Sequence, residues 1–206
     1  LTPKKRKLII QKKQIADLVV EEWTSQSDLI DPAMMPLTKL YNSAIDVVKD
    51  NRDSIIDDII SYADTDLLFY RAKSPEPLVE LQSKVWDPLL ASLENELGHR
   101  FVISKGIQYA QQPVVLLKLI REIFSSMPDT SIAATHLITT LTGSALLSLL
   151  LSKGMITDEK AWLAAHLDED WQNKHWGVDK EAHTRRLIQQ KDFKAAYQVL
   201  NPHSFL

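Results

Sequence analysis

Residues 62–90 read YADTDLLFYRAKSPEPLVELQSKVWDPLL, and this stretch organises the rest of the chain. It begins with two carboxylates, Asp64 and Asp66, on either side of a threonine. Asp and Thr side chains can bond nearby backbone amides and so fix a turn. A short apolar run then ends in Arg71, and a Pro-Glu-Pro break sets the direction of a following amphipathic helix that carries Trp86. The stretch therefore predicts a structural turn between two helical halves.

The Asp-Thr-Asp triplet also has a chemical interpretation. Asp64 and Asp66 could hold a divalent metal through hard oxygen ligands, which would make the protein a metal-dependent enzyme. Two carboxylates without a third ligand or a phosphate-binding loop are a weak metal signal, so the structural interpretation is preferred.

Composition excludes several classes of protein. A chain of 206 residues that is 45% hydrophobic can bury one core, or one helical domain with a small appendage. The formal net charge of -3 provides no basic field for nucleic acid. Without cysteine there is neither a disulfide framework nor thiol chemistry. The five glycines are scattered, so no phosphate-cradling loop and no cofactor are predicted.

The amino-terminal segment predicts a small β-rich piece. A basic run at residues 4–7 leads into Leu8, Ile9 and Ile10, which are typical of a short strand. Because a lone strand is not stable, we expect the earlier strands of its sheet to lie upstream. No segment here is apolar enough for a secretion signal. The predicted fold is α+β and mainly α, with residues 1–12 as the tail of a small β domain and residues 13–206 as an α-helical domain.

Helical spacing of apolar residues recurs along most of the chain. The predicted helices cover residues 14–25, 36–48, 54–62, 78–97 and 113–124. In the first of these, Trp23 is expected in the core, while Glu21 and Glu22 are expected to face water. Gly98 is a plausible helix stop.

Residues 130–152 carry no formal charge and are long enough to cross a bilayer. His136, Gly143 and several Thr and Ser residues argue against a membrane span, and no Lys or Arg cluster flanks the segment. The segment is therefore predicted to be one central helix buried on all sides, without stable membrane insertion.

Residues 157–177 form the second informative stretch. Thr157 predicts a helix N-cap, with acidic residues in the first turn. In a single helix to Gly177, the indoles of Trp162 and Trp176 would lie on one face with Glu169 and Gln172 between them. Such a carboxylate is either a buried acid or the polar centre of a binding patch, in which Trp supplies affinity.

The histidines indicate no metal site. His166, His175 and His183 are not spaced as a paired i, i+4 site, and no cysteine is available as a further ligand. We expect them at the surface or at helix caps.

Six motifs in order resemble the assembly chaperone of the ATP synthase F(1) alpha subunit. They are EEWxxQ at 21–26, MPLTxLxNxAID at 35–46, DTDxLxYR at 64–71, a loose LxxxWDPL at 81–89, TGS at 142–144 and LDEDWQxxxWG at 167–177. The resemblance covers nearly the whole chain. It implies a small amino-terminal β domain followed by a larger helical domain.

The resemblance also implies a non-enzymatic function. A member of this family binds the unassembled alpha subunit, prevents its aggregation and releases it into the alpha/beta hexamer, without ATP. The acidic residue of the last motif corresponds to Glu169, which we predict to form the functional cluster with Asp168, Gln172 and Trp176. A second set is predicted to be structural: Asp64, Asp66, Arg71, Trp23 and Trp86.

A helical adaptor for another protein partner is the nearest alternative. The protein is expected to be a monomer, in the cytoplasm if the source is a bacterium and in the mitochondrial matrix if it is a eukaryote.

Overall fold

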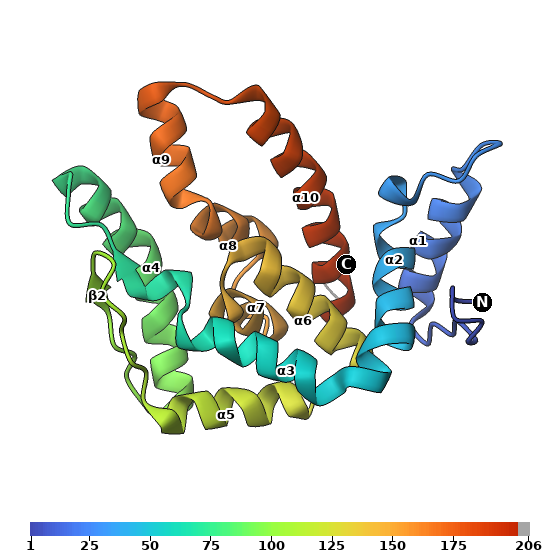
Figure 1. Ribbon diagram of the computed structural model, residues 1–206, viewed down its shortest axis with the longest axis horizontal. Helices are drawn as coiled ribbons and strands as arrows, with labels where there is room; N and C mark the ends of the chain where they lie inside the picture. Colours follow the sequence, from blue (N-terminus) through green and yellow to red (C-terminus); the bar gives the residue numbers. More distant parts are fainter. Residues whose placement is uncertain (202–206) are drawn as a thin grey trace.

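The computed structural model describes residues 1–201, and most of them are helical (Figure 1). The first half contains α1 (Lys13–Thr24), η1 (Pro32–Met34), α2 (Pro36–Ser43), η2 (Ala44–Val48), α3 (Lys49–Asp64), η3 (Leu67–Phe69), β1 (Tyr70–Arg71) and α4 (Glu76–Leu97). The second half contains β2 (Ser104–Lys105), α5 (Val114–Ser125), α6 (Asp129–Thr142), α7 (Ala145–Ser152), α8 (Asp158–Ala165), α9 (Leu167–Trp176) and α10 (Lys180–Leu200).

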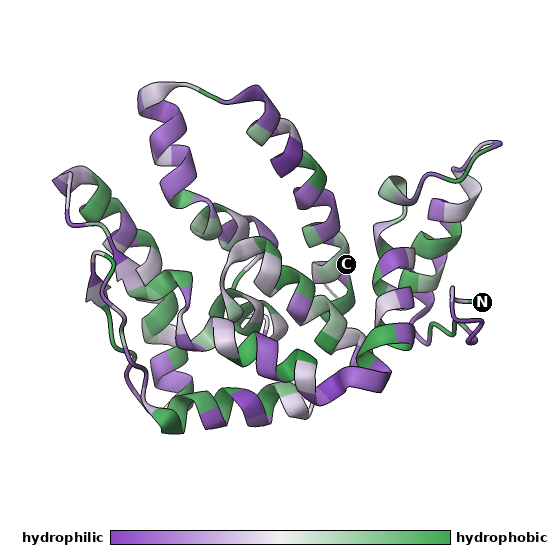
Figure 2. Cartoon of the chain, in the orientation of Figure 1, coloured by the Kyte–Doolittle hydropathy of each residue, from purple (hydrophilic) through white to green (hydrophobic). Residues whose placement is uncertain are grey.

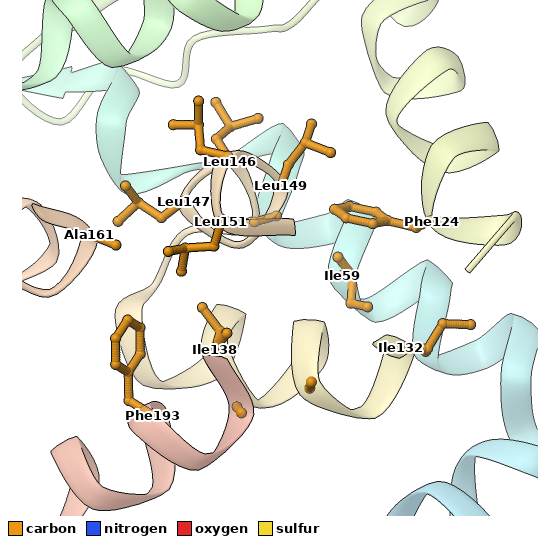
Figure 3. Close-up of a cluster of buried hydrophobic side chains, with 14 of the residues drawn as sticks. Ile59, Phe124, Ile132, Ile138, Leu146, Leu147, Leu149, Leu151, Ala161 and Phe193 are labelled. Atoms are coloured by element: carbon orange, nitrogen blue, oxygen red, sulfur yellow. The ribbon is translucent and has the colours of Figure 1, made fainter. Parts of the chain in front are cut away.

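The core is built around α7, which Figure 1 shows end-on at the centre of the molecule. This helix contacts α3, α6, α8 and α10, and every residue from Ala145 to Leu151 is buried. Figure 3 shows Phe124 from α5, Ile59 from α3 and Phe193 from α10 directed towards the α7 leucines. A helix that is apolar on all sides can be stable only when other elements cover it completely, and the fold provides that cover.

The prediction of one helix over residues 130–152 is wrong, because the chain turns at Gly143. Gly143 has φ +68°, a left-handed conformation that favours glycine and ends α6. Ser144 then caps α7 by accepting a hydrogen bond from the Leu147 amide at 3.0 Å. None of the helices among residues 1–201 is long and apolar enough to cross a membrane.

Helices α1 and α2 form a pair at one end of the molecule, and here the burial of two residues was predicted wrongly. Trp23 is 49% exposed because the core-facing side of α1 carries Ile15 and Val19 instead. Glu22 is half-buried, and its carboxylate accepts hydrogen bonds from the Leu37 and Thr38 amides at 2.6 and 2.8 Å. Glu22 therefore caps α2 from another helix.

The strand predicted at residues 8–10 is absent, since these residues lie in no helix or strand. The strands among residues 1–201 are β1 and β2, which pair with each other, so no described strand pairs with residues 8–10. The amino-terminal segment contacts η2 and the start of α3 instead. Thr2 donates a hydrogen bond to the Asp46 carboxylate at 2.7 Å, and Arg6 pairs with Asp50 at 2.6 Å.

Strands β1 and β2 form a parallel pair, with Tyr70 opposite Ser104 and Arg71 opposite Lys105. The pair lies beside α4, at the opposite end of the molecule from α1 and α2 (Figure 1). The α+β and mainly α fold class is therefore correct as a coarse description, although its strands lie in the middle of the sequence.

Candidate functional site

The single helix predicted over residues 158–176 is two helices, α8 and α9, which meet at His166. His166 has φ -105° and ψ 15°, outside the helical region. Trp162 is buried, where it packs on Phe193 at 5.0 Å between ring centroids, whereas Trp176 is 79% exposed. The two indoles therefore do not share a face, contrary to the sequence prediction.

The three histidines that were predicted at the surface or at helix caps lie in both kinds of place, and His166 is the residue at the C-cap of α8 and the N-cap of α9. His166 is buried, and its ring lies 4.0 Å from the Trp162 ring between centroids. Burial lowers the pKa of this imidazole, which favours the neutral form. The other two, His175 and His183, are exposed as predicted, and His175 stacks on Trp171 at 4.3 Å.

The first turn of α9 carries three consecutive acidic residues, where carboxylates interact favourably with the helix dipole. Asp168 accepts a hydrogen bond at 2.8 Å from Gln82 of α4, and Gln82 in turn accepts one at 2.7 Å from the Ala72 amide just after β1. Gln82 is itself buried. The chain from Asp168 through Gln82 thus joins α9 to the end of β1.

Arg186 of α10 approaches the same turn of α9 from the other side. Its guanidinium makes a two-pronged hydrogen bond with the Asp170 carboxylate, one branch at 3.0 Å, and lies 3.8 Å from the Glu169 carboxylate. The planar guanidinium is well suited to such bidentate pairing. Glu169 has the longer contact and keeps about two fifths of its side chain exposed, so its carboxylate remains accessible.

Exposed apolar side chains lie on α9 or just after it, and on the helices that precede and follow it in the chain. They are Leu163 on α8, Trp176 and Val178 at the end of α9, and Leu187 and Ile188 on α10. Most residues of α9 and of the first half of α10 are hydrophilic (Figure 2). Gln172 is exposed on α9 among these residues. Exposed apolar side chains together with an accessible carboxylate on the same group of helices are compatible with a protein-binding surface.

The Asp-Thr-Asp triplet places its two carboxylates in different environments. Asp66 is completely buried and accepts hydrogen bonds from the Ser144 hydroxyl at 2.7 Å and from the Leu146 amide at 2.9 Å. Desolvation outweighs these hydrogen bonds and raises the pKa of Asp66 to about 6. Asp64 instead accepts a 2.6 Å hydrogen bond from the exposed Tyr109 hydroxyl.

Arg71 and Trp86 form a buried pair between β1 and α4. The Arg71 guanidinium lies 4.9 Å from the centroid of the Trp86 ring, donates to the Leu68 carbonyl and pairs with Asp87 at 2.8 Å. The Trp86 indole donates to the Ala164 carbonyl at 2.9 Å, at the end of α8. Two contacts, through Trp86 and Gln82, therefore fix α4 against α8 and α9.

The geometry does not favour a metal at Asp64 and Asp66. Both oxygens of Asp66 are engaged by α7, and no group of three His, Asp or Glu side chains in residues 1–201 is arranged to hold a metal ion.

Comparison with known proteins identifies the family. Residues 1–94 match the family described as ATP12 chaperone protein. The structure superposes on the Atu1473 protein of Agrobacterium tumefaciens with a TM-score of 0.92 and 39% identity, covering 97% of this chain and 75% of that one. Atp12 from Paracoccus denitrificans gives a TM-score of 0.90 and 33% identity, covering 97% of this chain and 86% of that one. The chain belongs to the ATP12 chaperone family.

A mitochondrial relative belongs to the same ATP12 group. The protein atp12 of Schizosaccharomyces pombe is 27% identical over 179 residues, which are 82% of this chain. The present chain spans 62% of the length of that relative.

Sequence reasoning missed three residues of this ATP12 family member that hold the two acidic clusters in place. Gln82 and Arg186 hold the acidic turn from α4 and α10, and Ser144 joins Asp66 to α7. Gln82 could have been suspected, because a polar residue between the apolar positions Leu81 and Val85 of a helix is a candidate buried amide. Arg186 carries no such signal, since its partners lie in another helix.

Proposed function

We propose that this protein is an assembly chaperone that binds the unassembled ATP synthase F(1) alpha subunit, keeps it from aggregating and releases it into the alpha/beta hexamer. Membership of the ATP12 chaperone family supports this function. The observation that carries the proposal is the acidic turn of α9, whose carboxylates are oriented by Gln82 and Arg186, together with the exposed apolar side chains on α8, α9 and α10.

The proposed function follows from mass action. A partner that binds only the free subunit lowers the concentration of the species that self-associates through exposed apolar surface. The beta subunit then displaces the chaperone by forming a larger interface with the alpha subunit. These steps break no covalent bond and use no cofactor or ATP. We therefore propose that the protein is a binding partner and not an enzyme, and that it acts as a monomer.

The client-binding cluster comprises Glu169, Asp168, Gln172 and Trp176. Trp176 is the large exposed aromatic group of the surface, and exposed indoles contribute strongly to binding when a partner covers them. Glu169 supplies a carboxylate for a basic group of the client. Asp168 shares its carboxylate with Gln82 and so acts on the client through the position of α9.

Co-expression with the isolated alpha subunit tests the proposal. The protein is expected to raise the soluble fraction of the alpha subunit several-fold, with no comparable effect on the beta subunit. Glu169→Lys should abolish this effect, because it places a positive charge beside Arg186 and opposite a basic group of the client. No gain in soluble alpha subunit with the unaltered protein would refute the assignment.

Two controls separate the client surface from folding. Glu122→Lys makes the same charge change on an exposed position of α5, at the other side of the molecule, and should leave protection intact. Circular dichroism of Glu169→Lys should show native helicity. Loss of helicity would mean that Glu169 supports the fold and not the client surface.

The compartment follows the source of the chain. We propose that the protein acts in the cytoplasm of a bacterium, or in the mitochondrial matrix of a eukaryote, where ATP synthase heads are assembled. The fission-yeast relative is described as mitochondrial.

A further inference from the structure

Strand β2 has an open edge. Among the described residues the sheet has two strands, so β2 has a neighbour only on the β1 side. The Gly106 amide donates to the Arg71 carbonyl at 2.7 Å, which shows that residue 106 directs its backbone towards β1. Because backbone groups alternate along a strand, the amide and carbonyl of Lys105 point away from β1. An open edge of this kind can accept another strand.

The segment around β2 is fixed by contacts that leave this edge open. The Gln112 side chain is buried, accepts from the Val102 amide at 3.0 Å, and donates to the Val102 and Ala110 carbonyls at 2.9 Å each. The Tyr109 hydroxyl is bound to Asp64, which closes the loop onto the end of α3. A segment that is already ordered loses little entropy when it binds a partner.

Exposed side chains flank the two residues of β2. Ile103 and Lys105 are exposed and Ser104 between them is partly covered, and the bend at residues 106–108 that follows the strand exposes Ile107. Ile107 is 99% exposed, the highest value among the large hydrophobic residues described. The exposed β-branched Ile103 beside the strand favours pairing with a further strand, and Ile107 adds an apolar side chain just beyond it.

Two lysines give this edge a positive charge. Lys105 is exposed on β2, and the stem of Lys73 lies over Gly106, where an added Cβ would come within 2.4 Å of the Lys73 Cε atom. Gly106 has φ +85°, so both its backbone conformation and the space beside it favour glycine. A strand that pairs here should therefore carry an acidic residue near apolar ones.

We propose that the outer edge of β2 binds an extended segment of the client by strand addition. The segment pairs with the backbone of Lys105, places apolar side chains against Ile103 and Ile107, and brings a carboxylate to Lys105 and Lys73. This inference rests on the proposed function, since the client is the unassembled alpha subunit. The edge lies beside α4, and Gln82 of α4 connects the end of β1 to the acidic turn of α9.

A proline substitution tests the backbone contact. Lys105→Pro removes the outward amide and leaves the bond from Gly106 to Arg71, since proline is tolerated at a strand edge. Lys105→Ala is the matched control, because it removes the same charge and keeps the amide. The affinity of the 206-residue chain for purified alpha subunit is measured for both variants. Lys105→Pro is expected to bind at least about tenfold more weakly than Lys105→Ala. Circular dichroism and thermal unfolding check that both variants fold.

A second variant tests the edge without altering the backbone. Ile107→Asp changes a fully exposed side chain, so folding should be unaffected, and it should weaken binding about fivefold or more by opposing the client carboxylate. In the unaltered protein, amide exchange at Lys105 should slow at least tenfold when the alpha subunit is added.

The outcomes separate the two proposals. If the unaltered chain protects the alpha subunit and both Lys105→Pro and Ile107→Asp do so equally well, strand addition is refuted and the chaperone function stands. If the unaltered chain gives no protection, the chaperone function fails and strand addition to this client fails with it. Sedimentation of the free chain as a dimer that Lys105→Pro dissociates would show instead that the edge pairs with a second copy.

Discussion

Asp66 is a carboxylate in a polar turn of the sequence, yet the structure buries it completely. It lies one position from an exposed turn, yet both its oxygens accept hydrogen bonds at the start of α7. Three hydrogen bonds, from Ser144 and from the Leu146 and Leu68 amides, partly offset the cost of burying a carboxylate. The remaining desolvation raises the pKa of this group to about 6.

This pKa makes stability depend on pH. An aspartate in an unfolded chain has a pKa near 4, so the folded protein binds a proton more tightly between about pH 4 and pH 6. The contribution of Asp66 to the free energy of unfolding therefore falls as pH rises through that range, by about 3 kcal/mol. Asp66→Asn should remove this slope, while losing about 1–3 kcal/mol, because Asn keeps a single acceptor oxygen and one of the Leu146 and Leu68 amides loses its partner.

Urea unfolding of the unaltered protein and of Asp66→Asn, at about pH 4.5, 5.5, 6.5 and 7.5, measures how their free energies of unfolding differ. The unfolding free energy of the unaltered protein minus that of the variant should decrease towards pH 6 and then level off. A constant difference across the series would show that Asp66 is ionised throughout.

At the scale of elements, the short helices are joined by side chains from their neighbours. Asp66 supports the start of α7, Asp168 and Gln82 join α9 to α4, and Glu22 of α1 caps α2. The first backbone amides of a helix have no hydrogen-bond acceptor within that helix. A carboxylate from another element can accept from these amides, and the contact then fixes the angle between the helix and that element. The helices are thus oriented by polar contacts as well as by the core.

Glu22 provides a clean test of such a cap. Glu22→Ala should lower the free energy of unfolding by about 1–2 kcal/mol, because the Leu37 and Thr38 amides lose their acceptor. Glu21→Ala is the matched control on the exposed side of α1 and should change stability by no more than about 0.5 kcal/mol. Equal effects of the two substitutions, measured by chemical denaturation, would contradict the capping role.

At the scale of the whole molecule, stability is divided between a core and a projecting arm. Helices α6 and α7 are packed against α3 and α10, whereas α9 buries only Leu167 and the first half of α10 is largely exposed (Figure 1). The arm formed by residues 167–191 is held by Arg186 and by the contacts to α4. Regions with few buried contacts open at low free energy.

Hydrogen exchange should show this division directly. Amides of residues 168–176 and 181–190 are expected to exchange faster than those of residues 146–151. Arg186→Met should raise exchange in the arm several-fold, because Asp170 loses its partner, and should leave α7 unchanged. Arg185→Met, at the exposed neighbouring position, is the control. Equal protection of α9 and α7 would refute the arm as an independently opening unit.

The sequence by itself determined the features that depend on neighbouring residues. Thr157 accepts a hydrogen bond from the Lys160 amide and caps α8 as predicted, and Gly98 ends α4 in a left-handed conformation. Proline at residues 36 and 113 marks the start of α2 and α5. These signals are local, since a cap or a helical repeat is specified within a few positions. The family motifs are also a property of the sequence alone.

Only the tertiary structure decided which side chains are buried and what they contact. Trp86 is buried and Trp23 is half exposed, although both lie in amphipathic helices, because burial depends on which face a neighbouring element covers. Residue type and spacing likewise gave no sign that Asp66 meets Ser144, 78 positions away, or that Asp168 meets Gln82, 86 positions away. Contacts at such separations are set by the packing of whole helices, and a periodic pattern of residues carries no information about them.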